Sequence, residues 1–332
     1  MNPEKIIVIK SKSTDPYYNL AYEEYLLNEL DKEDLVILFY KNHNTIVIGR
    51  NQNPWHETAH DKFIKQRGKL ARRFSGGGTV FHDSGNLNFS FLTSKNNYDL
   101  DWNFNIVQET LNSFNIESQL TERYDLFINQ FKFSGNAFHL KKDKACHHGT
   151  LLLNSDLKNI SRYLKSEIPI IEGNYISSNP SSIINLSEYN SNINANNFIE
   201  KFINVLKLNV NNCSVIEKEI NPEFVGENKK IYLKNKSWDW IYGRTPNFIT
   251  EINNKYISLK LKIEKGYIKN INVNILESEI INGNKAKLIS FFNQFLLNER
   301  FYVDKVHLLL NLFLQINFSI KQPVHNKLKS IK

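Results

Sequence analysis

Cysteine is almost absent from this chain of 332 residues, which has only Cys146 and Cys213. The two lie far apart and outside any metal-ligand spacing, so a disulfide framework is excluded and a reducing compartment is expected. No apolar run approaches the roughly 20 residues needed to span a bilayer. The N-terminal MNPEKIIVIK also lacks the layout of a signal or transit peptide. The sequence therefore predicts a cytoplasmic protein that does not use the membrane.

Acidic residues are outnumbered by basic ones, 34 to 42, which gives a formal net charge of +8. An excess of this kind can attract nucleic acid, a membrane surface or an acidic protein. Basic runs such as Lys141-Lys142 and Lys229-Lys230 are short, however, and no aromatic residues are repeatedly interleaved with them. We therefore expect no nucleic-acid partner, while an acidic protein partner stays open.

Periodicity along the first three quarters of the chain indicates a mixture of strands and helices. Residues 6–10, 34–41 and 44–50 are apolar and β-rich, and Asp15-Pro16 is typical of a helix start. Apolar residues at helical spacing predict helices near 104–114 and 198–206. The Ser-, Asn- and Pro-rich segment 166–197 is interpreted as a long surface loop.

The pattern changes near residue 244, where GRTPNF indicates a linker or chain reversal. Strict alternation over 257–263 and 271–275 predicts a hairpin turning at 264–266, and two apolar-striped helices follow it. A hairpin with two helices is a small α+β unit. We therefore predict an α+β protein with a large mixed-sheet domain, residues 1–245, and a small C-terminal α+β domain, residues 246–332.

The stretch RRFSGGGTVFHDSGNLNFSF, residues 72–91, joins two arginines to a glycine triplet. It matches neither the P-loop nor the dinucleotide fingerprint. Glycines nevertheless let backbone N–H groups approach an anion closely, and Arg72 and Arg73 suit phosphate or carboxylate. A mobile hairpin loop with surface arginines explains the same residues, and the loop alone does not decide between the two.

A second cluster joins KFSGNAF, residues 132–138, to HHGT, residues 147–150. Lys132 on a predicted strand could supply a fixed positive charge to a phosphate, although most strand lysines are simply solvated. His147 and His148 point to opposite faces of a strand, so they do not favour a metal site. Cys146 is a candidate nucleophile, but a buried, inert thiol is the favoured interpretation.

Several motifs in order resemble the lipoate–protein ligase family: NLAYEEYLL, VIGRNQNPWHE, LARRFSGGGTVFHDSGNLNFSF, KFSGNAFHLKKDKACHHGTLLLNSDL and WDWIYGRTPNF. That family includes lipoyltransferases and is related to octanoyltransferases and biotin–protein ligases. The resemblance implies the biotin/lipoate ligase fold and a two-step reaction. ATP, with Mg²⁺, first activates lipoate to lipoyl-AMP. The lipoyl group then passes to a lysine of an acceptor, either a glycine-cleavage H protein or an E2 subunit of a 2-oxoacid dehydrogenase.

The resemblance also implies roles for individual residues. Lys132 is the implied catalytic residue, contacting both acyl group and phosphate. The other implied residues are, for ATP, Arg73, Gly78, Thr79, Val80 and Phe81; for lipoate, Gly76, Gly77 and His82; and, in support, Asn86 and Asp125. No protein-held metal site is implied.

Two alternatives stay open at this point. A lipoyl- or octanoyltransferase would use a preactivated or protein-bound acyl donor, and a cysteine-dependent version of it would need Cys146. A non-enzymatic module would bind lipoylated domains through its basic surface. Phe74 and Cys146 depart from the family pattern, which leaves the acyl preference undetermined.

Overall fold

The strand β2 (Asp34–Tyr40) is buried along its whole length. A near-continuous apolar run of this kind is typical of a strand covered on both faces. Leu35, Ile37 and Phe39 belong to one hydrophobic core, whereas Val36 and Leu38 belong to a second core on the opposite face. The alternation along a single strand thus supplies both layers of packing around the largest sheet.

The computed structural model describes residues 3–210, 213–222, 226–277 and 285–318. The chain divides into two units, one of residues 1–165 and 176–244 and the other of residues 166–175 and 245–332. Residues 278–284 and 319–332 of the predicted C-terminal domain lie outside the described residues. Within the described part of the chain, no helix has both the length and the apolar character needed to cross a membrane.

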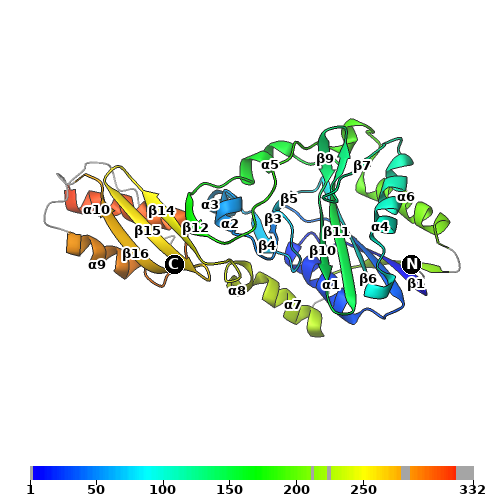
Figure 1. The fold of residues 1–332 in the computed structure, drawn as a ribbon, viewed down its shortest axis with the longest axis horizontal. Helices are drawn as coiled ribbons and strands as arrows, with labels where there is room; N and C mark the ends of the chain where they lie inside the picture. The colour runs from blue at the N-terminus through cyan, green and yellow to red at the C-terminus, as the bar shows by residue number, and fades with distance from the viewer. Residues whose placement is uncertain (1–2, 211–212, 223–225, 278–284, 319–332) are drawn as a thin grey trace. The chain divides into compact units, whose positions relative to one another are not determined.

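The first unit contains most of the helices and strands (Figure 1). In chain order they are β1 (Lys5–Ser11), α1 (Pro16–Glu29), β2, β3 (Thr45–Ile48), α2 (Pro54–Glu57), α3 (His60–Lys65), β4 (Lys69–Arg72), β5 (Val80–His82), β6 (Asn86–Ser94), α4 (Leu100–Asn112), β7 (Gln119–Leu120), β8 (Leu126–Ile128), β9 (Phe131–Ser134), β10 (Asn136–Leu140), β11 (Lys144–Leu152), α5 (Leu157–Tyr163), α6 (Ala195–Leu208), β13 (Ser214–Ile220), α7 (Gly226–Lys236) and α8 (Trp238–Ile241).

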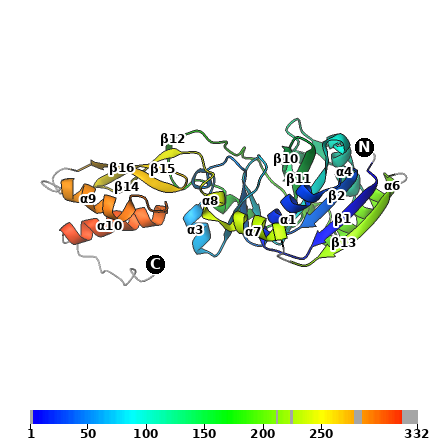
Figure 2. The ribbon, with the colours of Figure 1, turned by 90° about the horizontal axis from the view of Figure 1, so that it is seen from below.

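The largest sheet has six strands in the order β10-β11-β6-β2-β1-β13. β1 runs parallel to both β2 and β13, and the remaining neighbours are antiparallel, so the sheet is mixed as predicted. β2, β1 and β13 lie side by side in Figure 2. Helices α4 and α6 pack against each other and contribute to the core on one face, and Leu27 of α1 belongs to the core on the other.

Two three-stranded sheets carry the motifs singled out in the sequence. The first, in the order β4-β3-β5, contains the strands on either side of the glycine triplet. The second, β7-β8-β9, contains Lys132 on β9. The turn at Ser84-Gly85 joins β5 to β6, which confirms the predicted sequence of loop, strand, turn and strand.

The second unit is a four-stranded antiparallel sheet with two helices, in the strand order β12-β14-β15-β16. Its elements are β12 (Ile170–Gly173), β14 (Phe248–Asn253), β15 (Ile257–Glu264), β16 (Tyr267–Ile275), α9 (Lys285–Leu296) and α10 (Val303–Phe318). The predicted hairpin and both helices are confirmed. The interpretation of 166–197 as a long surface loop is wrong for β12, because backbone pairing with β14 makes that stretch a strand, which its own sequence does not specify.

Candidate functional site

The first of the two arginines before the glycines, Arg72, has a structural role. Its side chain is fully buried at the end of β4. It donates from Nε and Nη2 to the carbonyl of Ile241, at 2.8 and 2.6 Å, and from Nη1 to the carbonyl of Gly49 at 3.0 Å. Burial lowers the pKa of the guanidinium to about 9. The expectation that Arg72 faces an anion is therefore wrong, since backbone carbonyls take its N–H groups.

Arg73 organises the glycine loop. It donates from Nε and Nη2 to the carbonyl of Gly76, at 2.9 and 2.7 Å, and from Nη2 to the carbonyl of Gly78 at 2.6 Å. Between them Gly77 has a φ of 86°, and a Cβ there would lie 2.8 Å from Arg73 Nη2, so the turn requires glycine. Burial lowers the pKa of Arg73 to about 10, which still leaves the guanidinium charged at neutral pH. The loop is therefore ordered around a fixed cation and is not a mobile hairpin.

Lys132 lies opposite this loop, on β9, with a carboxylate partner. Its Nζ is 2.8 Å from Oδ1 of Asp125, and both side chains are partly exposed. The Lys132 backbone is held in turn by the segment after β12: its N–H donates to the carbonyl of Ser182 at 2.8 Å, and its carbonyl accepts from Ile184 at 3.1 Å. The lysine is thus held at both its backbone and its charged end.

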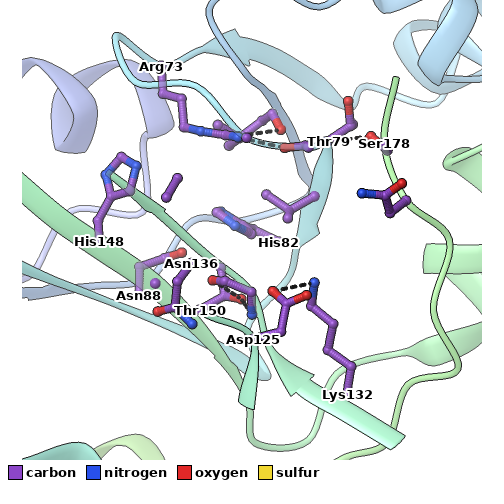
Figure 3. A pocket seen from close by; sticks show the side chains of 18 of the residues that line it. Arg73, Thr79, His82, Asn88, Asp125, Lys132, Asn136, His148, Thr150 and Ser178 are labelled. Carbon is purple, nitrogen blue, oxygen red and sulfur yellow. Dashed lines mark hydrogen bonds and ion pairs between the residues drawn. The ribbon is translucent and has the colours of Figure 1, made fainter. Parts of the chain in front are cut away.

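Two cavities, of about 250 and 460 Å³, meet at this lysine. The residues that line both are Thr79, Val80, Lys132, Gly135, Thr150, Ser178 and Asn179. Figure 3 shows Arg73 and His82 above the Lys132–Asp125 pair, with Thr79 and Ser178 at one side. The two cavities thus form one continuous site, with the cationic side chain of Lys132 where they meet.

The walls of the two cavities differ. The smaller cavity extends toward Leu20, Tyr40 and Val47, with Arg73 and His148 beside them. The larger cavity is bounded by a set of apolar side chains, with serines and Asn86 between them. Those apolar side chains are Phe81, Phe133, Leu152, Leu157, Ile160, Leu164, Pro180 and Ile183.

All but one of the residues implied by the sequence line one of the cavities. The smaller cavity includes Arg73, Gly77, Gly78, His82 and Asp125; the larger includes Phe81 and Asn86; and Thr79, Val80 and Lys132 belong to both. Gly76 lines neither cavity, and its carbonyl accepts from Arg73. Loop, hairpin and strand, up to sixty residues apart, are thus brought to one place.

His82 and His148 are both buried beside the smaller cavity, in different hydrogen-bonding environments. Nδ1 of His82 is 3.0 Å from the side-chain nitrogen of Asn42. Burial, reinforced by the charge of Arg73, lowers the pKa of His82 to about 3, so the ring is neutral at physiological pH. His148 is bonded at both nitrogens, through Nε2 to Ser75 Oγ at 2.6 Å and through Nδ1 to Glu23 at 3.1 Å.

Glu23, Cys146 and His148 bring one ligand atom each within 4.8 Å of one another, the spacing that a metal ion could use. We assign no metal to them because both nitrogens of His148 already have partners. Burial, followed by the charge of Glu23, raises the pKa of the Cys146 thiol well above its usual value, which disfavours the thiolate that a metal requires. The same shift favours the inert interpretation of Cys146.

The segment after Tyr175 also contributes to the site, which its sequence did not indicate. Ser178 accepts from the Thr79 N–H at 2.8 Å, and Gln52 donates to Ser178 Oγ at 3.0 Å. Ser178 also bonds to the carboxylate of the buried Glu57. Long loops are often functional, but the sequence of this one has no periodicity that would assign it to the site.

The fold of the chain matches solved ligases. The crystal structure of P. falciparum LipL1 in complex with lipoate is 30% identical, with a TM-score of 0.62 over 92% of this chain and 93% of that one. A lipoate-protein ligase A bound with ATP shares the fold at 20% identity, with a TM-score of 0.57 over 72% of this chain and 98% of that one. The α+β fold of the lipoate ligase type is therefore confirmed.

Sequence comparison gives the family directly. Residues 15–207 match the model of the lipoyl protein ligase A/B catalytic domain. The lipoate-protein ligase A of Blochmanniella floridana is 36% identical over 270 residues, which cover 78% of this chain and 80% of that protein. The chain belongs to the lipoate–protein ligase family, as its motifs predicted.

Proposed function

We propose that the two cavities hold the two halves of an acyl-adenylate, with Lys132 beside the bond that joins them. The chain is an ATP-dependent lipoate–protein ligase, and the observation that supports this use of its site is that Lys132 lines both cavities. An acyl-adenylate carries its reactive mixed anhydride at its centre, between acyl chain and nucleoside. A cation at the junction of the two cavities would therefore lie beside the mixed anhydride and stabilise its negative charge.

The acyl chain occupies the smaller cavity in this proposal. Leu20, Tyr40 and Val47 give it apolar and aromatic walls, and all three are buried. Arg73 lines the same cavity, although its N–H groups bond to loop carbonyls. Its implied contact with the nucleotide therefore stays a prediction, and holding the glycine loop in shape is the role its bonds support most directly.

The nucleoside occupies the larger cavity, where Asn86 offers a means of recognising adenine. Asn88 donates from its amide nitrogen to the backbone carbonyl of Tyr40 at 3.2 Å, so its Oδ1 faces Asn86 and accepts from the Asn86 amide nitrogen at 3.1 Å. This leaves Asn86 Oδ1 buried with no partner among the described residues. An unpaired acceptor matches the 6-amino group of adenine and opposes the 6-oxo group of guanine.

The chemistry proceeds in two steps. A lipoate carboxylate oxygen attacks the α-phosphorus of ATP, the bond from that phosphorus to the bridging oxygen breaks, and pyrophosphate leaves. The acceptor lysine nitrogen then attacks the acyl carbon, the bond from that carbon to the phosphate oxygen breaks, and AMP leaves as the nitrogen loses its proton. Lys132 stabilises negative charge in both steps, and no nucleophile of this chain is needed.

Mg²⁺ enters with the nucleotide in this proposal. The ion prefers carboxylate and phosphate oxygens and usually takes only one or two carboxylates from the protein. Asp125, partly exposed beside Lys132, is a donor of that kind. When bound, the ion would offset the charge of the phosphates.

The acceptor is a lipoyl domain, and we propose an H protein or an E2 subunit as its source. The cytoplasm is the proposed compartment, because a chain with two cysteines and no disulfide framework suits reducing conditions. The transferase alternative is not favoured, since a relative matched over 80% of its length is a lipoate-protein ligase A.

The test is to incubate the protein with free lipoate, an acceptor domain and ATP, and to read the acceptor by intact mass. The expected result is one added lipoyl group that requires ATP and appears with AMP and pyrophosphate. A protein that lipoylates only from lipoyl-AMP or from an acylated donor domain would contradict the ligase assignment.

A further inference from the structure

His82 carries an unused hydrogen-bonding atom beside the smaller cavity. The side chain is 3% exposed, and Nε2 is buried without a partner among the described residues. Figure 3 shows the ring among the cavity-lining side chains, between Arg73 and Asn136. A buried polar atom without a partner destabilises the fold, so such an atom beside a cavity points to a ligand.

The surrounding hydrogen bonds fix which ring nitrogen carries the proton. Asn19 donates from its amide nitrogen to the backbone carbonyls of Ser13 and Lys41, at 3.0 and 3.1 Å. Because carbonyls only accept, this orients the Asn19 amide, whose nitrogen shares its two hydrogens among these carbonyls and Oδ1 of Asn42, 2.9 Å away. Asn42 must then present its own nitrogen to His82.

An amide nitrogen is a donor, so Nδ1 of His82 accepts from Asn42 and carries no proton. Burial and the nearby Arg73 charge keep the ring neutral, and a neutral ring bears its single proton on the other nitrogen. Nε2 is therefore an N–H donor whose direction is set by two backbone carbonyls through a pair of asparagines.

The position of His82 along β5 indicates which part of a substrate it meets. Val80 lies with Lys132 where the two cavities meet, and His82 is two residues further along the strand, on the same face. Two residues of strand span about 7 Å, so His82 stands well away from the reacting carboxyl carbon. Beyond that carbon, lipoate has acceptor atoms only in the two sulfurs of the dithiolane ring, at the far end of its methylene chain.

We propose that His82 Nε2–H donates to a dithiolane sulfur and so makes the acyl cavity selective for a sulfur-bearing chain over a hydrocarbon chain of the same shape. The inference rests on the assignment of the acyl group to the smaller cavity. Sulfur is a weak acceptor, but a sulfur-free chain would leave the buried donor without any partner. The ring of Tyr40, which lines the same cavity, adds a surface that polarisable sulfur favours.

The test uses two acids and two substitutions. 5-Cyclopentylpentanoate has the chain and ring of lipoate with carbon in place of sulfur, so it isolates the sulfur. His82→Asn keeps a side-chain acceptor near the Nδ1 position for Asn42 but removes the donor, whereas His82→Gln restores an N–H near the Nε2 position. Pyrophosphate release with ATP measures kcat/KM for each acid, and thermal unfolding checks the fold of each variant.

We expect the natural protein to prefer lipoate over the carbocyclic acid by about tenfold, which corresponds to the net contribution of one hydrogen bond. His82→Asn should lower that preference to about twofold or less by slowing lipoate alone, and His82→Gln should recover much of it. If His82→Asn slows both acids equally, or if His82→Gln restores nothing, the assigned contact is wrong. No pyrophosphate from the natural protein with either acid would instead contradict the ligase assignment itself.

Discussion

The two cavities meet at the same lysine, but each presents an unpaired atom of the opposite kind. Among the described residues, the smaller cavity has an unpaired donor, Nε2–H of His82, and the larger has an unpaired acceptor, Oδ1 of Asn86. In both cases a backbone carbonyl, which can only accept, fixes the orientation of an asparagine amide, and the hydrogen bonds of that amide determine the donor or acceptor character of the unpaired atom. A backbone carbonyl can only accept a hydrogen bond, so it fixes which end of a neighbouring asparagine amide faces it. The other end of that amide then determines whether the next side chain offers a donor or an acceptor to the cavity.

The largest expected effect comes from the residue that the cavities share. Lys132→Ala should lower pyrophosphate release by about 10²–10³-fold or more, because it removes the cation beside the developing charge. The side chain is partly exposed, so its loss opens no core cavity and the melting temperature should stay close to that of the natural protein. Both substrates should be affected together.

Arginine at position 132 is the matched control, since it keeps the charge but spreads it over a planar fork. We expect Lys132→Arg to recover only part of the activity. Adenylation by Lys132→Ala at a near-normal rate would show that the lysine shared by the two cavities does not stabilise the reacting charge.

A smaller effect is expected at Asn86, confined to the nucleotide. Asn86→Leu should lower kcat/KM for ATP by about tenfold, because the adenine amino group loses its acceptor. Purine riboside triphosphate, which lacks that amino group, should be used by Asn86→Leu about as well as by the natural protein. Initial rates of pyrophosphate release with each nucleotide at saturating lipoate provide the measurement.

The cross-check is to measure acid preference in Asn86→Leu and nucleotide preference in His82→Asn. If the two cavities recognise their substrates independently, Asn86→Leu should keep the natural acid preference and His82→Asn should keep the natural nucleotide preference. Changes in both preferences from either substitution would mean that the atoms act through a common distortion of the sheet.

The strands and helices around the site were predictable, because apolar periodicity is local. The different environments of Arg72 and Arg73 were partly predictable as well: successive residues at a strand end point to opposite faces, so one anion could not face both. The asparagine pairs were not predictable. Asn19, Asn42 and His82 lie on separate segments, so the hydrogen bonds that orient these side chains form only in the folded chain.

The segment 176–184 is a second part of the site whose position could not be predicted from its local sequence. Its composition indicates a loop correctly, but its contacts are with Gln52, Glu57, Thr79 and Lys132, which come from three distant parts of the chain. A loop without periodicity gains its position from such partners, so its place in the site could only come from the fold.

The smallest effect is expected at Cys146, which lies next to the smaller cavity but does not line it. The thiol is fully buried, and burial and the neighbouring Glu23 raise its pKa, so no thiolate is available at neutral pH. Cys146→Ala should leave ligation within about twofold of the natural rate and cost about 1 kcal/mol of unfolding free energy, as for many small core truncations. Intact-mass lipoylation and a denaturant titration measure the two quantities. If the variant still released pyrophosphate but no longer lipoylated the acceptor, the acyl group would pass through a thioester on Cys146, and the smaller cavity would have a nucleophile beside it that the larger cavity lacks.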